Sequence, residues 1–154
     1  MTAHESTQIK EGQVLPKLNA VQQAKQISQL SLMLTNFLPT RSVMIKRHID
    51  YRFHPAKRYA EDYLLWLTIL LNKHPAYYLK LPMAYSFKGD FGEDGLTGNL
   101  NKAHHGVIDT FIKVYRDKKI SYLTFIFLMA YSWLKYFRRQ IIVGSNKLFN
   151  QLGN

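Results

Sequence analysis

An adjacent pair of carboxylates, Glu61 and Asp62, opens the most apolar stretch of this sequence. The ten residues that follow carry no formal charge, and eight of them are Leu, Ile, Trp or Tyr. A carboxylate held in the first turn of a helix beside a cleft can accept a proton from a hydroxyl group. An acidic side chain also suits this position for a structural reason, because the helix macrodipole favours negative charge there. Spacing alone leaves both interpretations open.

Other residues that could do chemistry fit known site patterns poorly. A calcium loop of the EF-hand type that started at Asp90 would place Gly92 and Asn101 at two ligand positions, so we reject it. The sequence contains no G-x-x-x-x-G-K-[ST] phosphate-binding loop. His104 and His105 are neighbours, which on a helix point about 100° apart, so they are not expected to share a metal ion. We therefore expect no metal site in this chain.

The charge balance implies an anionic partner. Lys and Arg number 21 against 10 Asp and Glu, which gives a formal net charge of +11. Nucleic acid, anionic lipid headgroups and phosphorylated substrates all match such a surface. Basic and aromatic residues do not interleave as in RNA-binding motifs, so we expect no nucleic acid. The absence of Cys excludes disulfides, thiolate metal sites and a cysteine nucleophile.

The sequence predicts few helices or strands in the first third of the chain. Residues 1–17 are polar and are expected to form a loose leader without a signal peptide. Apolar residues at helical spacing predict a helix over 18–35, which must end before Pro39. The segment 41–47, RSVMIKR, is β-branched and apolar in its middle and predicts a short strand.

The apolar stretch 63–71 has no polar side, which is typical of a helix that is buried all round. A buried strand is the competing interpretation, but the length of the stretch and the Pro75 that follows it favour a helix. Residues 76–87 predict an extended strand that is interrupted at Pro82. The segment 88–99 contains four Gly and predicts a loop, either a plain surface loop or a lid that faces substrate.

Two helices are expected at the C-terminal end, one over 100–116 and one that is capped by Ser121. The uncharged run 120–134 is shorter than the roughly 20 residues that a membrane-spanning helix needs. Basic clusters flank it, so residues 118–154 are expected to form a basic, aromatic helix and tail. This helix suits either a membrane interface or packing on the core. The expected fold class is mixed α/β, mostly helical, with a few short strands.

Three segments, in order, resemble the second half of family 2 glycosyltransferases of the GT-A fold. They are NFLPTRSVMIKR from residue 36, RYAEDYLLWLTILL from residue 58 and PAYYLKLPMAYSF from residue 75. The resemblance covers roughly residues 30–117. The later YSFKGDFGEDGLTGNL is similar to the subgroup that builds bacterial lipopolysaccharide or lipooligosaccharide. The resemblance implies that residues 18–117 form the acceptor-side part of a GT-A-like domain.

The resemblance also implies an activity, which is inverting transfer of a sugar from a nucleotide-sugar to a hydroxyl of a lipid-linked oligosaccharide. Asp62 would act as the general base, with Glu61 as its catalytic neighbour. The side chains expected to bind substrate are Arg41, Lys88, Asp90 and Trp66. The expected location is the cytoplasm, peripheral to the inner face of an anionic membrane.

The sequence departs from this family in its donor-binding part. No two Asp are spaced by one residue, so the Asp-x-Asp metal motif is missing. Positions that carry Asp and Arg in the family correspond to Leu64 and Thr68. We therefore expect no cofactor in this chain, with Mn or Mg only in a missing donor half, and no activity for the chain alone. The alternative function is a non-catalytic basic module that binds anionic membrane or nucleic acid.

Overall fold

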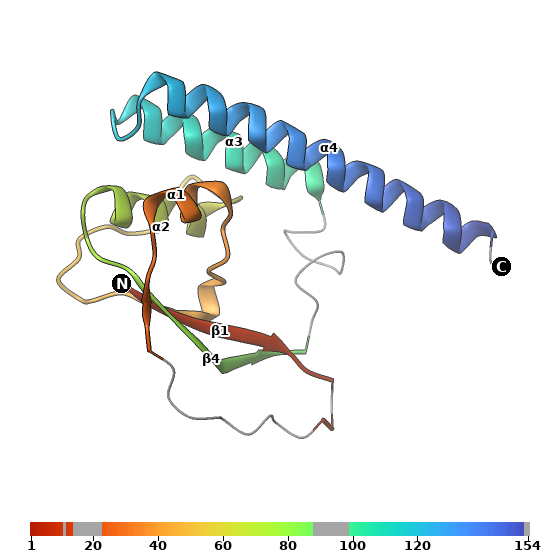
Figure 1. Cartoon of the computed structure of the whole chain (residues 1–154), viewed down its shortest axis with the longest axis horizontal. Helices are drawn as coiled ribbons and strands as arrows, with labels where there is room; N and C mark the ends of the chain where they lie inside the picture. The colour runs from red at the N-terminus through yellow and green to blue at the C-terminus, as the bar shows by residue number, and fades with distance from the viewer. Residues whose placement is uncertain (11, 14–22, 88–98, 153–154) are drawn as a thin grey trace.

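The computed structural model arranges the chain in layers (Figure 1). A sheet forms one side of the molecule, and helices α1 (Gln29–Leu34) and α2 (Glu61–Leu71) lie between it and a helical hairpin. The hairpin consists of α3 (Leu100–Arg116) and α4 (Tyr122–Leu152), and α4 extends beyond the end of α3. The architecture is mixed α/β, as the sequence predicts. The structure describes residues 1–10, 12–13, 23–87 and 99–152, with side chains up to residue 143.

The sheet has four strands in the order β2-β4-β1-β3. The two long central strands, β1 (Thr2–Gln8) and β4 (Tyr77–Ser86), run parallel. The edge strands β2 (Lys25–Gln26) and β3 (Val43–Met44) have two residues each and pair antiparallel to β4 and β1. The crossover between the central strands therefore contains both α1 and α2.

The prediction of a loose leader is wrong for residues 2–8, which form the central strand β1. Its sequence, TAHESTQ, is polar and lacks the apolar alternation that normally marks a strand. Backbone pairing to β4 does not depend on side-chain polarity, and the buried side chains of Ala3 and Ile9 anchor the strand to the core. The strand thus depends on a partner that lies far away in the sequence.

The strand predicted over 76–87 is confirmed as β4, but it runs unbroken through Pro82, and the predicted interruption is only a shift in its pairing with β1. Thr2 to His4 pair with Tyr77 to Leu79 in register, but the register shifts on both sides of Glu5, which lies opposite Pro82. Proline has no backbone N–H to donate to a neighbouring strand, so an irregularity at this point is expected.

Two predicted elements are shorter than the sequence suggested. The helix predicted over 18–35 is helical only from Gln29, because Ser28 caps α1 by accepting a hydrogen bond from the Ser31 amide at 3.0 Å. Residues 25–26 pair with the edge of β4 instead, and 14–22 lie outside the described residues. The strand predicted over 41–47 is reduced to β3, since a 3₁₀ helix, η1 (Thr40–Ser42), precedes it.

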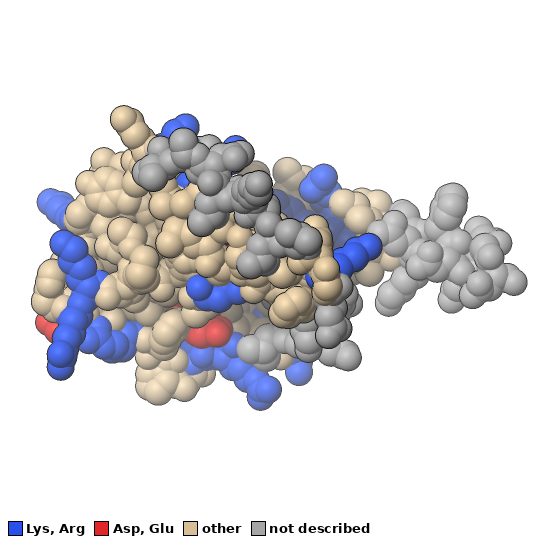
Figure 2. Space-filling view, turned by 90° about the horizontal axis from the view of Figure 1, so that it is seen from below, with Lys and Arg blue, Asp and Glu red and all other residues tan. Residues whose placement is uncertain are grey.

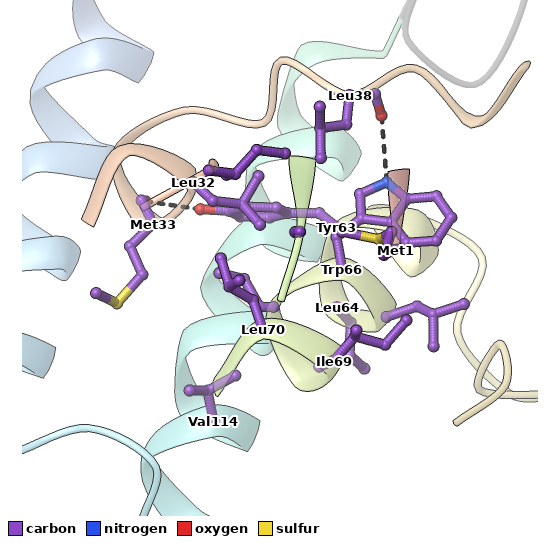
Figure 3. Close-up of a cluster of buried hydrophobic side chains, with 14 of the residues drawn as sticks. Met1, Leu32, Met33, Leu38, Tyr63, Leu64, Trp66, Ile69, Leu70 and Val114 are labelled. Carbon is purple, nitrogen blue, oxygen red and sulfur yellow. Dashed lines mark hydrogen bonds between the residues drawn. The ribbon is translucent and has the colours of Figure 1, made fainter. Parts of the chain in front are cut away.

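The predicted buried helix is confirmed as α2, in which seven of eleven residues are buried. Two hydrogen bonds tie this helix to the end of α1 and to the segment that follows α1 (Figure 3). The Tyr63 hydroxyl donates to the Met33 carbonyl at 2.6 Å, and Trp66 Nε1 donates to the Leu38 carbonyl at 3.2 Å. Both bonds are buried, so the polar atoms of two large core side chains are satisfied.

The helical hairpin packs on this core through one face of each helix. The predicted cap is confirmed, because Ser121 Oγ accepts a hydrogen bond from the Thr124 amide at 3.2 Å before α4 begins. Leu128 and Ser132 of α4 are buried, whereas its other side is exposed. Gly106 of α3 lies so close to the loop before α2 that an added Cβ would sit 2.6 Å from the Tyr59 carbonyl oxygen. Within the described part of the chain, no helix has the length and apolar character that crossing a bilayer requires.

We predict that Tyr63→Phe lowers the free energy of unfolding by about 1–3 kcal/mol, because it leaves the buried Met33 carbonyl without its donor. Chemical denaturation measures the change. The matched control is Tyr122→Phe at an exposed position of α4, which we expect to alter stability by less than about 0.5 kcal/mol. Equal stabilities for the two variants would contradict the role given to the Tyr63 hydroxyl.

Candidate active site at the start of helix α2

The chain enters α2 through a strained residue. Ala60, the N-cap, has φ 54° and ψ 32°, which is the left-handed region, and it provides no side-chain cap. This conformation costs an L-residue roughly 1–2 kcal/mol and is often found at functional sites. It is followed directly by Glu61 and Asp62 in the first turn, as the sequence predicts. The macrodipole of the helix favours both carboxylates there.

Asp62 is held by three donors. Its Oδ2 lies 3.3 Å from Thr40 Oγ1 and 3.4 Å from Asn36 Nδ2, and its Oδ1 accepts from the Tyr63 amide at 2.6 Å. Asp62 is only partly buried, so its carboxylate is open to solvent. These contacts join residues 36–40 to the start of α2, so two of the three segments that carry the family resemblance meet at this carboxylate.

Glu61 lies in different surroundings from Asp62. Burial lowers the pKa of the Lys57 ammonium, and the negative charges of Asp109 and Glu61 partly oppose this shift. Glu61 is thus close enough to act on Lys57, whereas the partners of Asp62 come from residues 36–40. The adjacent carboxylates serve two separate environments, as their angular separation on a helix requires.

The other residues that the sequence predicts to bind substrate are Arg41, Lys88, Asp90 and Trp66. Arg41 follows Thr40 directly in the chain, and the Nε of its exposed side chain donates to Ser6 Oγ of β1 at 2.6 Å. Lys88 and Asp90 lie outside the described residues.

The prediction that Trp66 binds substrate is wrong. Its side chain is 2% exposed, its indole N–H is used by the Leu38 carbonyl, and Phe53 packs edge-on at 6.0 Å between ring centroids. A tryptophan in a helix with no polar side is enclosed by the core, so it cannot reach a ligand.

Asn36 and Thr40 contact Asp62, but the sequence did not identify them as site residues. The one sequence feature that could have indicated a site role is their position on either side of Pro39, in the first segment that resembles the glycosyltransferase family. A proline-containing turn places short polar side chains in fixed directions. Only the packing of this turn against α2, through Leu38 and Trp66, reveals that those directions converge on Asp62.

The neighbouring histidines of α3 also have separate surroundings. His104 is buried beneath α4, where its ring stacks on Tyr136 at 4.5 Å and meets Trp133 edge-on at 4.6 Å. His105 is exposed on another side of α3. Among the described residues, no three His, Asp or Glu side chains gather in a way that could hold a metal ion.

His104 makes stability depend on pH. Burial is the main cause that lowers its pKa below the ordinary 6.5, and the charges of His105 and Arg139 add to the effect. Between the folded-state and unfolded-state pKa values the unfolded chain binds more protons, so stability falls as pH falls below about 6.5. We predict that His104→Phe, which keeps an aromatic ring, reduces the fall in melting temperature between pH 7 and pH 5.

The control for this prediction is His48→Phe, which replaces an exposed histidine outside the helical hairpin. This variant should keep the full pH dependence of the unmodified protein. Thermal melts of all three proteins at matched ionic strength provide the measurement. A pH dependence that His104→Phe leaves unchanged would show that other groups cause it.

Comparison of the chain with models of known protein families, with curated protein sequences and with solved structures found no match.

Proposed function

We propose that this chain is the acceptor-side part of an inverting glycosyltransferase and that Asp62 is its general base. The observation that carries this proposal is the pair of contacts from Asn36 and Thr40 to Asp62. A helix-dipole role would require only a carboxylate in the first turn. It would not require two polar side chains from another segment to converge on the same carboxylate oxygen.

The hydrogen-bonding capacity of Asp62 leaves room for a substrate. A carboxylate can accept about four hydrogen bonds, and the described residues donate three to Asp62. An acceptor hydroxyl at the remaining position would give its proton to Asp62 as its oxygen bonds to the anomeric carbon of the sugar. The bond from that carbon to the nucleotide diphosphate would break on the opposite side, and the diphosphate would leave with the bonding electrons.

The start of α2 is suited to holding a base in place. The two hydrogen bonds from Tyr63 and Trp66 fix the first two turns against residues 33–38. Arg41, the residue after Thr40, is exposed, and its positive charge can attract the phosphate groups of a nucleotide-sugar or of an acceptor. A rigidly held base contributes to catalysis because its geometry is set before substrate binds.

The exposed face of α4 supports a membrane-bound acceptor and a location at the cytoplasmic face of an anionic membrane. Large apolar side chains point away from the core along this helix, and Arg138 and Arg139 lie among them. A helical face of this composition binds anionic bilayers by apolar burial and by charge. Among the α4 residues whose side chains the structure describes, the large exposed apolar ones are Tyr122, Leu123, Ile126, Phe127, Trp133, Leu134, Phe137, Ile141, Ile142 and Val143.

We predict that Asp62→Asn lowers turnover by about a hundredfold or more in an enzyme reconstituted with a donor-binding half. The amide keeps the size of the side chain and can still accept from Thr40, so the melting temperature should change little. Sugar transfer from a nucleotide-sugar to a glycolipid acceptor is the measurement.

The control is Glu61→Gln, which removes the neighbouring charge from the same turn and should reduce turnover less. If Asp62→Asn kept full turnover and lost only stability, the carboxylate would be there for the helix alone. Salt-dependent binding of the chain to polyanions, with no effect of nucleotide-sugar, would instead favour the non-catalytic module.

We predict that the chain binds vesicles that contain anionic lipid and that Leu134→Gln with Phe137→Gln reduces the fraction bound about tenfold or more. Leu134 and Phe137 are 66% and 56% exposed, so their loss removes apolar contact without disturbing the core. Vesicle flotation measures the bound fraction.

The matched control is Tyr77→Gln with Met83→Gln, which replaces two exposed apolar side chains of β4. This pair should leave the bound fraction unchanged. A similar loss with both pairs would mean that α4 is not the membrane-binding face.

A further inference from the structure

A cavity of about 490 Å³ lies between α3 and the loop that leads into α2. It is on the Glu61 side of α2, away from the segment that contacts Asp62. The loop contributes residues 54–59 except Pro55, and α3 contributes one stripe of side chains. The α3 side chains are Lys102, His105, Asp109 and Lys113, with Gly106 between them. Their spacing of three or four residues puts them on the same helical face.

The lining of this cavity is strongly basic. Lys57, Arg58, Lys102 and Lys113 carry positive charge, and Asp109 is the one acidic side chain among the lining residues. Lys and Arg are also spread widely over the face of the molecule seen in Figure 2, where Asp and Glu take up little area. The cavity stands out from this general positive charge because four basic side chains line one open hollow.

Two of the four cations are already engaged. Lys113 Nζ lies 2.7 Å from the Asp117 carboxylate. Lys57 Nζ donates to the Gly106 carbonyl at 2.7 Å and is close enough to Asp109 and Glu61 to interact with their charges. Arg58 and Lys102 are exposed, and within the described residues neither has an ion pair. These two side chains therefore supply the uncompensated positive charge.

The walls of the cavity are fixed relative to each other. Gly106 is buried against Tyr59, and a Cβ at position 106 would lie 2.6 to 2.8 Å from Tyr59 atoms. The Lys57 bond to the Gly106 carbonyl joins the same two walls. Since both contacts link the loop to α3, Arg58 and Lys102 project from a preformed frame, which lowers the entropic cost of binding a ligand.

We propose that this cavity binds a phosphate ester, with Arg58 and Lys102 as its principal ligands. Phosphate suits the site because it accepts several charge-assisted hydrogen bonds, and the guanidinium of arginine matches two of its oxygens at once. The imidazoles of His54 and His105 line the same cavity and can donate further hydrogen bonds. The site is separate from Asp62 and does not depend on the proposed glycosyl transfer.

The test uses the full chain and two probes that carry the same chemical group. Glycerol 3-phosphate is the soluble phosphate ester, and vesicles of phosphatidylcholine with phosphatidic acid present it as a lipid headgroup. Calorimetry measures the first and flotation the second. We expect Arg58→Gln with Lys102→Gln to weaken binding of at least one probe about tenfold or more, because charge-assisted bonds are lost.

The control is Lys25→Gln with Lys80→Gln, which removes the same charge from exposed positions on the sheet. This pair should leave binding within about twofold of the unmodified protein, as expected for changes outside the site. The probe whose binding depends on Arg58 and Lys102 shows whether the cavity binds a soluble phosphate ester or a lipid headgroup. The single change Lys102→Gln, at an exposed helical position, replaces the pair if circular dichroism shows that the pair does not fold.

Two results would overturn the site. One is equal weakening in both pairs of variants, which would mean that net charge alone attracts phosphate. The other is no binding of either probe by the unmodified protein.

Discussion

The fold depends on enclosing a helix that has no polar side. Helix α2 must be covered all round, and the covering groups come from every layer of the molecule. Each large apolar side chain that is removed from water contributes roughly 1.5–3 kcal/mol, so this helix is the main source of core stability. The side chains that enclose it include Ala3 of β1, Leu32 and Met33 of α1, Phe111 and Val114 of α3, and Leu128 of α4.

The same packing organises the candidate active site. Residues 33–40 cover one side of α2 and are fixed by the hydroxyl of Tyr63 and the indole of Trp66. This segment also carries the two side chains that reach Asp62. Core and site therefore share a segment, and a shift of a few tenths of an ångström in the packing of Leu38 would be transmitted to the contacts of the carboxylate.

The start of α2 separates two chemically different faces. On one side Asp62 and Arg41 present a carboxylate and a guanidinium near the surface. On the other side Lys57 bridges to α3 and borders a basic cavity. Ala60, with its left-handed backbone conformation, joins the loop that lines the cavity to the start of α2, between these two faces. A single helix terminus thus supports both the proposed base and the proposed phosphate site.

The elements whose signals are local could be predicted from the sequence. Helices α2 and α3, the cap at Ser121 and the irregular strand around Pro82 could all be predicted, because periodicity, capping and proline act within a few residues. Tertiary structure alone decided the rest. Polar residues 2–8 became a central strand because a distant strand offered backbone partners. Trp66 became a core residue, and separate segments met at Asp62 and around the cavity, because burying α2 on all sides fixed where each segment had to lie.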